Sequence, residues 1–121
     1  MVDLLPRVRD LGNDVELAVF NTGQTPFYNE LKSAGVKMHV FAGPGNVYNP
    51  LHIIRLARLM RGFDLVHAHN TACQMFAALA RSKRNILVTT EHSTSTRRRR
   101  YAIFRYIDRW MYRRYDRIIC I

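Results

Sequence analysis

Short apolar runs alternate with longer amphipathic or alanine-rich segments along the whole chain, and this alternation constrains the fold more than any other feature. The short runs predict strands, because they are rich in β-branched and aliphatic residues. They lie at residues 15–20, 36–41, 64–67, 86–90 and 117–121. The segments between them predict helices at residues 1–11, 26–34, 51–61, 71–81 and 101–115. Continuous apolar strands that alternate with helices predict an α/β fold with a doubly wound parallel sheet, covered on both faces.

Local signals mark where the predicted helices begin and end. Thr25 followed by Pro26 predicts an N-cap and a first helical turn, and Gly35 predicts the end of that helix. Pro6 lies inside the first predicted helix, so this helix is expected to begin near Pro6 or to kink there. In the helix at residues 51–61, the expected buried face comprises Ile53, Ile54, Leu56, Ala57 and Met60.

The last predicted helix combines an apolar stripe with many arginines. The stripe is expected to pack on the sheet and to leave the arginines outward, and it comprises Ile103, Ile107, Trp110 and Met111. Between Arg97 and Arg117 there are nine arginines and two aspartates, so this segment carries +7 of the net charge of +10. Such a charge attracts nucleic acid, anionic lipid or phosphorylated small molecules, although a solvated helix face is the plainer interpretation.

Several classes of protein are disfavoured by what the sequence lacks. No apolar run approaches the roughly 18 residues of a membrane span, and the N-terminus does not read as a signal peptide. Cys73 and Cys120 belong to no Cys/His cluster, which predicts buried, reduced thiols in a cytosolic protein and no zinc site. No dinucleotide fingerprint, phosphate-binding loop or D-x-D pattern is present, so neither a cofactor nor a metal ion is expected.

Ligands of a doubly wound sheet bind at the carboxyl ends of its strands, which selects three loops. These loops are residues 21–24, 69–71 and 91–94. His67 and His69 alternate in one strand, so we expect one of them to point into a helix-covered face. We assign His67 to structure, leave His69 open, and favour a functional role for His92, which lies beyond its strand among polar neighbours.

Three segments carry a resemblance to a known family. They are Asp64–Asn70 (DLVHAHN), Thr89–Ser93 (TTEHS) and the passage from Asp108-Arg109-Trp110 to Asp116-Arg117-Ile118-Ile119. In this order and spacing they resemble the N-terminal domain of family 4 glycosyltransferases. The resemblance covers essentially the whole chain, residues 1–121, and implies the acceptor-side, Rossmann-like domain of a retaining GT-B enzyme.

The resemblance also implies an activity and a site. Such enzymes are hexosyl-type transferases that move a sugar from a nucleotide-sugar to an acceptor hydroxyl, and we expect a role in cell-surface polysaccharide or glycolipid synthesis. By the likeness, His92 is the catalytic residue that lies against the transferred sugar. The expected acceptor-binding residues are Glu91, Ser93, Thr94, His69 and Asn70.

The chain departs from the family pattern at both ends. The family's first apolar strand and its glycine-rich loop are missing, and so is the C-terminal donor domain. We therefore expect an incomplete sheet without its first central strand, and no transfer by these residues alone. The strands at residues 15–20 and 64–67 would flank the missing strand, so we expect marginal stability, direct pairing of the two, or self-association through the unpaired edges.

The partners follow from the same interpretation. They are an acceptor glycan or lipid-linked sugar, and an anionic membrane contacted peripherally, from the cytoplasm, through Arg97, Arg98, Arg99 and Arg100. The alternative functions are a basic nucleic-acid-binding module that uses Arg97–Arg100 with Arg113 and Arg114, and a non-catalytic interaction domain. Nucleic acid is not expected, because no recognition fold for it matches the chain.

Overall fold

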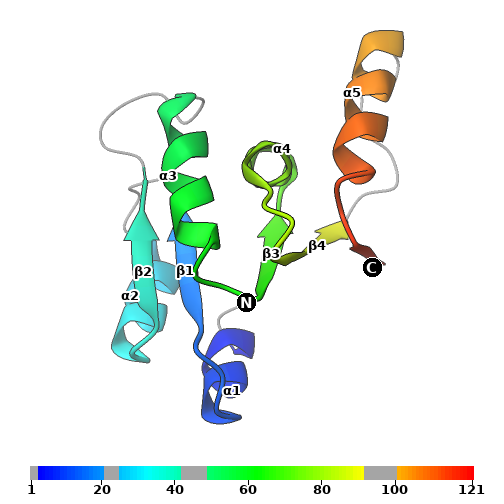
Figure 1. Ribbon diagram of the computed structural model, residues 1–121. Helices are drawn as coiled ribbons and strands as arrows, with labels where there is room; N and C mark the ends of the chain where they lie inside the picture. Colours follow the sequence, from blue (N-terminus) through cyan, green and yellow to red (C-terminus); the bar gives the residue numbers. More distant parts are fainter. Residues whose placement is uncertain (1–2, 21–24, 42–48, 92–100) are drawn as a thin grey trace. The chain divides into compact units, whose positions relative to one another are not determined.

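The computed structural model describes residues 3–20, 25–41, 49–91 and 101–121, in which five helices and five strands alternate along the chain (Figure 1). The chain divides into two compact units, Met1–Asn49 and Pro50–Ile121. All described strands are parallel to their neighbours, and they form a two-stranded sheet and a three-stranded sheet. The predicted α/β, Rossmann-like fold class is therefore confirmed.

The first unit contains α1 (Leu4–Asp10), β1 (Glu16–Val19), α2 (Pro26–Ser33) and β2 (Lys37–Val40). The predicted cap of α2 is present, since the Thr25 hydroxyl accepts a hydrogen bond from the Tyr28 amide at 3.3 Å. Pro6 lies in the first turn of α1, where a missing N–H costs no helical hydrogen bond. Gly35 ends α2 with φ +77°, a conformation that L side chains rarely adopt.

A small apolar core joins the elements of this first unit. Phe20 and Phe41, which follow the two strands, stack with their ring centroids 5.5 Å apart. Leu31 of α2 and Val36 are also buried. The Arg9 side chain donates a hydrogen bond to the Ala34 carbonyl, which ties α1 to the end of α2.

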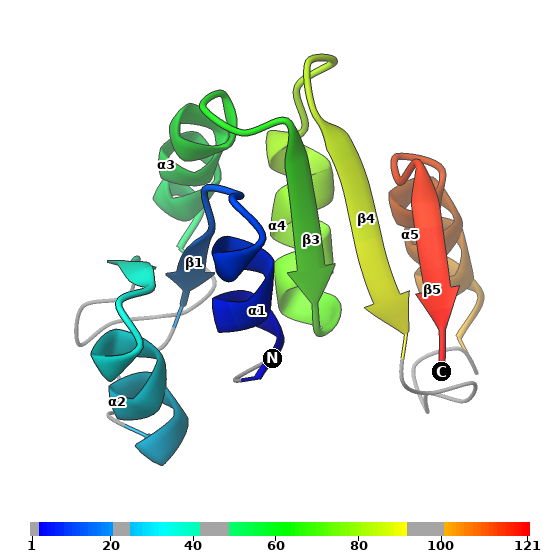
Figure 2. The same cartoon turned by 90° about the horizontal axis from the view of Figure 1, so that it is seen from below.

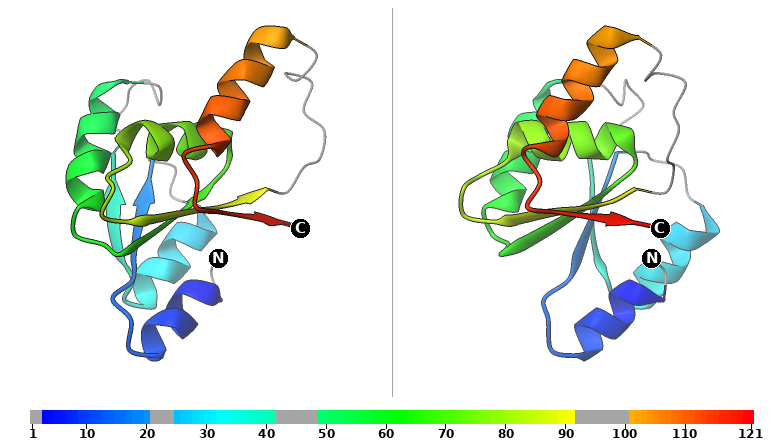
Figure 3. Two further views of the ribbon diagram at one scale, coloured as in Figure 1. Left: turned by 45° about the vertical axis from the view of Figure 1, so that its right-hand side comes forward. Right: turned by 90° about the vertical axis from the view of Figure 1, so that its right-hand side faces the viewer.

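The second unit contains α3 (Leu51–Met60), β3 (Leu65–His69), α4 (Thr71–Ala80), β4 (Ile86–Glu91), α5 (Ala102–Tyr112) and β5 (Arg117–Cys120). The three strands run side by side in the order β3-β4-β5 (Figure 2). Helices α4 and α5 lie on the same face of this sheet (Figure 3). Helix α4 contacts β3 and β4, and both α3 and α5 contact α4.

Small side chains allow α4 to lie close to the sheet, as its alanine-rich sequence predicts. Ala77 and Ala78 of α4 belong to the buried core of this unit, together with Leu87 of β4 and Met111 of α5. Met60 at the end of α3 completes this core, and the Asn85 side chain donates a hydrogen bond to its carbonyl at 2.7 Å.

The order of helices and strands follows the sequence prediction, with two differences that matter for the site. Strand β3 extends to His69 and strand β4 extends to Glu91, so both residues belong to strands rather than to loops. Strands β1 and β3 belong to different described sheets, so direct pairing of the two, one of the three alternatives expected, is not among the described ladders.

The predicted buried faces of two helices need correction. In α3 the buried residues are His52, Leu56 and Met60, while Ile54 is 52% exposed. In α5 the predicted stripe faces away from the sheet apart from Met111, and the helix packs through Phe104, Asp108, Met111 and Tyr112. This orientation satisfies the Tyr112 hydroxyl, which reaches a carboxylate on β4.

Candidate functional site

The carboxyl ends of β3 and β4 lie at one edge of the three-stranded sheet, because the strands are parallel and in register (Figure 2). His69 pairs with Thr90, and Glu91 follows as the last residue of β4. Asn70 connects β3 directly to α4. The structure thus brings three of the predicted site residues, His69, Asn70 and Glu91, to a common edge.

Glu91 is held by two helices. The Tyr112 hydroxyl of α5 donates to Glu91 Oε2 at 2.5 Å, and Gln74 Nε2 of α4 lies 3.4 Å from the same oxygen. Gln74 Nε2 also donates to Thr89 Oγ1 at 2.8 Å, and the Tyr115 hydroxyl donates to the Gln74 carbonyl at 2.7 Å. Gln74 and Thr89 are fully buried. A polar network that includes the buried Gln74 and Thr89 therefore holds the Glu91 carboxylate on the side of the sheet that faces α4 and α5.

The sequence prediction missed this network. Gln74 is a polar residue inside an alanine-rich apolar helix, and this contrast is the sequence feature that could have indicated a buried polar role. Among the described residues, Gln74 Oε1 is buried without a hydrogen-bond partner. A buried amide oxygen of this kind costs free energy unless water or another group satisfies it.

His67 and His69 lie on the same face of the sheet, contrary to the expectation that they point to opposite faces. Residues two apart in a strand share a face, and their ring centroids are 4.1 Å apart. His67 Nε2 shares a hydrogen bond of 2.7 Å with Thr90 Oγ1, which supports our assignment of His67 to structure. Burial lowers the pKa of His67, which favours the neutral form of its ring.

The sheet separates the described candidates into two groups. Glu91 faces α4 and α5, because its carboxylate contacts Gln74 and Tyr112. His69 pairs with Thr90, the neighbour of Glu91 in the strand, and so projects from the opposite face. A ligand that contacts both side chains has to lie across the end of the sheet rather than against one face.

Asn70 has a backbone conformation that few residues adopt. Its φ is 69° and its ψ is 148°, and it is the one described residue other than glycine with a positive φ. Its carbonyl accepts the hydrogen bond from the Gln74 amide, while its exposed side chain makes no cap hydrogen bond to the first turn of α4. Strained backbone of this kind concentrates at functional sites, and it leaves the Asn70 amide side chain accessible at the strand end.

The other predicted site residues, His92, Ser93 and Thr94, lie outside the described residues, as do Arg97, Arg98, Arg99 and Arg100. Among the described residues, no group of three or more His, Cys, Asp or Glu side chains could hold a metal ion. Cys73 is half-buried, and burial raises the pKa of its thiol. Cys120 is exposed rather than buried as expected, because it lies in the outer strand of its sheet.

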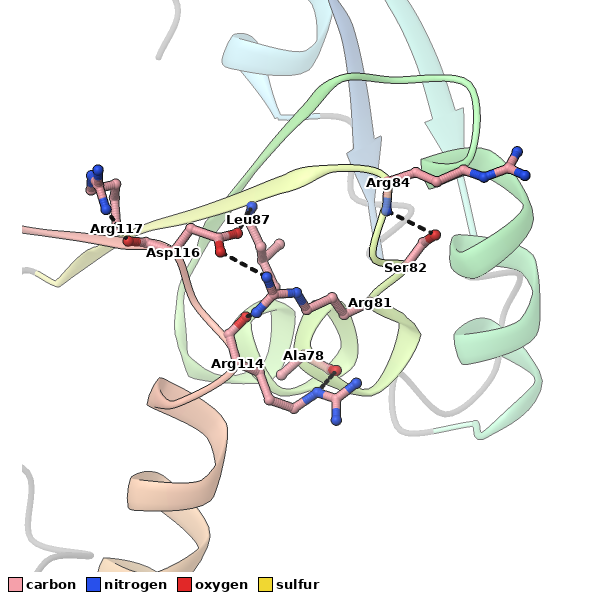
Figure 4. Close-up of polar contacts among 8 residues, drawn as sticks. All are labelled: Ala78, Arg81, Ser82, Arg84, Leu87, Arg114, Asp116 and Arg117. Carbon is pink, nitrogen blue, oxygen red and sulfur yellow. Dashed lines mark hydrogen bonds and ion pairs between the residues drawn. The ribbon is translucent and has the colours of Figure 1, made fainter.

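The helix-to-strand passage after α5 has a structural role. Asp116 accepts hydrogen bonds from Arg81 at 2.7 Å and from the Leu87 amide at 2.8 Å, and these contacts attach the start of β5 to α4 and β4 (Figure 4). The Leu87 amide and the Arg81 guanidinium hold the pKa of Asp116 below its usual value. The Arg114 side chain donates to the Ala78 carbonyl at 2.7 Å.

The parallel strands and alternating helices define an α/β protein of the Rossmann-like class, in which the carboxyl ends of the strands are the usual place for a ligand. The sequence matches the profile described as Glycosyltransferase Family 4 over residues 1–121, so the chain belongs to this family of glycosyltransferases. No curated protein and no solved structure matches the chain. In the part of the chain that the structure describes, no helix has the length and apolar character needed to cross a bilayer.

Proposed function

We propose that the chain is the acceptor-side domain of a retaining GT-B glycosyltransferase that transfers a hexosyl group from a nucleotide-sugar to an acceptor hydroxyl. Family membership over residues 1–121 supports a glycosyltransferase, and the remaining detail is our proposal. The observation that carries it is the position of His69, Asn70 and Glu91 at the same carboxyl edge of one parallel sheet.

The side chains at this edge suit a sugar acceptor. A carboxylate and an amide accept and donate hydrogen bonds to hydroxyl groups, and Glu91 is already oriented by Tyr112 and Gln74. In this proposal Glu91, His69 and Asn70 bind the acceptor together with Ser93 and Thr94. His92, the residue after the end of β4, contacts the transferred sugar and stabilises the charge that develops on it.

The donor is a substrate rather than a resident cofactor. We propose that a second Rossmann-like domain of a longer parent enzyme binds most of the nucleotide-sugar, and that these 121 residues alone transfer no sugar. The product in this proposal is a cell-surface polysaccharide or a glycolipid, made at the cytoplasmic face of a membrane. Contact with that membrane would involve Arg97–Arg100, and self-association would involve the outer edges of β1 and β3.

The test is a transfer assay with the parent enzyme that carries this domain, a panel of nucleotide-sugars and lipid-linked sugar acceptors. We expect His92→Ala to lower kcat by roughly 100-fold or more, because a group that stabilises transition-state charge contributes on this scale. Lys32→Ala, an exposed substitution on α2, is the matched control and should leave kcat unchanged. Unchanged turnover of His92→Ala would refute the assignment of the site.

A further inference from the structure

Helix α5 presents an apolar stripe that is exposed, apart from a contact between Trp110 and Arg114, in the part of the chain that the structure describes. Ile103, Tyr106, Ile107 and Trp110 follow the spacing i, i+3, i+4, i+7 and therefore share one side of the helix. Ile103 is 66% exposed, Tyr106 is 75% exposed and Trp110 is 42% exposed. The remaining member, Ile107, is also exposed.

The opposite side of α5 already has its partners. Asp108 and Met111 are buried, and Tyr112 donates its hydroxyl hydrogen bond to Glu91 on β4. These contacts fix the rotation of the helix about its axis. The stripe therefore stays on the surface, because turning it inward would break the contacts on the other side of the helix.

Cationic side chains border the stripe on one side and lie near its C-terminal end. Arg105, Arg109 and Arg113 are exposed and recur every four residues along one border. Beyond the end of the helix the Arg114 guanidinium lies over the Trp110 ring, 5.3 Å from its centroid, while its Nε donates to the Ala78 carbonyl. The segment from Arg97 to Arg117 carries nine arginines and two aspartates. The complement of this surface is both apolar and anionic.

We infer that α5 docks the protein in the plane of an anionic bilayer, and this inference rests on the peripheral location proposed above. The apolar stripe enters the boundary between head groups and acyl chains, and the bordering arginines pair with lipid phosphates. Tryptophan and tyrosine beside arginine are the side chains that favour this boundary. A helix of 11 residues is about 16 Å long, far short of the roughly 30 Å of a bilayer core, so it lies on the membrane.

An anionic bilayer fits the stripe better than nucleic acid or a protein groove does. Two of its four residues are isoleucines, which offer no stacking surface to bases. The charge is repeated along the whole helix rather than placed at one point, which matches a continuous anionic surface better than a single acidic partner side chain.

Trp110 is the single tryptophan of the chain and lies within the stripe, so its fluorescence reports directly on docking. The chain is mixed with vesicles of phosphatidylcholine alone, or with added phosphatidylglycerol, whose acyl chains carry bromine as a contact quencher. We expect a blue shift and quenching of Trp110 with the anionic vesicles only, and a loss of binding as the salt concentration rises. Circular dichroism establishes that each variant is folded.

Matched variants separate insertion from charge. Ile103→Asn should weaken binding to anionic vesicles roughly tenfold, because it removes one apolar side chain that enters the bilayer and leaves the charge unchanged. Leu11→Asn, at a position that is 81% exposed on the first unit, should have no effect. Arg105→Gln with Arg109→Gln should weaken binding more than Arg55→Gln with Arg58→Gln, which removes the same charge from α3.

Three outcomes would overturn the inference. Binding to anionic vesicles without quenching of Trp110 would mean adsorption by arginines alone, which leaves the proposed peripheral location intact. Tighter, salt-sensitive binding to RNA than to anionic vesicles would assign the surface to nucleic acid. Concentration-dependent dimerisation that Ile103→Asn abolishes would assign it to a second copy. The transfer assay with a soluble acceptor tests the proposed function separately, since it needs no membrane.

Discussion

Arg81 and Asp116 form an ion pair of 2.7 Å that joins the end of α4 to the start of β5 (Figure 4). The second carboxylate oxygen of Asp116 accepts the Leu87 amide at 2.8 Å, and the Arg81 guanidinium also donates to the Arg114 carbonyl. One acidic and one basic side chain therefore satisfy backbone groups of β4 and of the turn after α5. Asp116, which belongs to one of the segments that resemble the family, therefore links the end of α4 to β4 and to the start of β5.

The first prediction concerns this contact. Asp116→Ala should lower the free energy of unfolding of the second unit by roughly 2 kcal/mol, because it leaves the Leu87 amide and Arg81 without their acceptor. The backbone contact accounts for most of the loss, since both side chains are partly exposed and water screens the ion pair. Urea unfolding followed by Trp110 fluorescence measures the change. Asp10→Ala, which breaks the exposed pair with Arg9, is the control and should change little.

Acid should weaken both units through carboxylates whose pKa is lowered in the folded state. The Leu87 amide and then Arg81 lower the pKa of Asp116, and hydrogen bonds from Lys37 and then His39 lower the pKa of Glu16. The stability that such a group contributes is fully present above its unfolded pKa of about 4, and is lost as the pH falls through the folded pKa.

Urea unfolding at a series of pH values tests this second prediction. The free energy of unfolding should decline as the pH falls below about 4. Asp116→Asn should flatten the decline for the second unit, as reported by Trp110 in α5. An unchanged slope in that variant would show that other carboxylates dominate the acid response.

The order of the elements could be predicted from the sequence because its signals are local. The Thr25 cap, the Gly35 stop and the short apolar runs depend on a few neighbouring residues, and the structure confirms all three. The rotation of α5 could not be predicted in the same way. Apolar periodicity favours burial of Ile103 and Trp110, yet the hydroxyl of Tyr112 needs a partner, and that partner lies on a strand distant in sequence.

In the candidate site, too, some features follow from simple rules on the sequence and others depend on contacts between residues distant in sequence. That His69 and Glu91 meet at one edge follows from the rule for parallel sheets, and the structure agrees. Their separation onto opposite faces depends on the register of β3 with β4, which no local pattern encodes. Gln74 was missed because its role becomes visible only when α4 lies above Thr89.

The third prediction uses the strained backbone of Asn70. Glycine adopts a positive φ without steric cost, so Asn70→Gly should stabilise the second unit by roughly 1 kcal/mol, whereas Asn70→Ala should destabilise it by a similar amount. Urea unfolding of the two variants gives the sign of each change. If Asn70 binds the acceptor, Asn70→Gly in the parent enzyme should raise the KM for the acceptor despite the gain in stability. Equal stability of all three proteins would contradict the strain.

The fourth prediction concerns His67. Burial lowers the pKa of His67, so the folded protein resists protonation that the unfolded chain accepts. The stability that this group contributes is fully present above about pH 6.5 and is lost as the pH falls from there through the folded pKa. Urea unfolding between about pH 7 and pH 5 should show this loss, and His67→Gln should remove it while keeping a partner for Thr90. A slope unchanged by the substitution would contradict the assignment.

The fifth prediction tests whether the position of Glu91 matters for activity. Tyr112→Phe removes the hydroxyl that donates to Glu91 Oε2 at 2.5 Å and should cost roughly 1 kcal/mol of stability. In the parent enzyme it should also raise the KM for the acceptor, because the carboxylate then loses this short hydrogen bond and keeps only the longer contact of 3.4 Å to the Gln74 amide on α4. Tyr101→Phe, at a residue that is 65% exposed just before the same helix and outside its apolar stripe, is the matched control and should change neither quantity. A loss of stability with an unchanged KM would leave Tyr112 a structural residue and would separate Glu91 from acceptor binding.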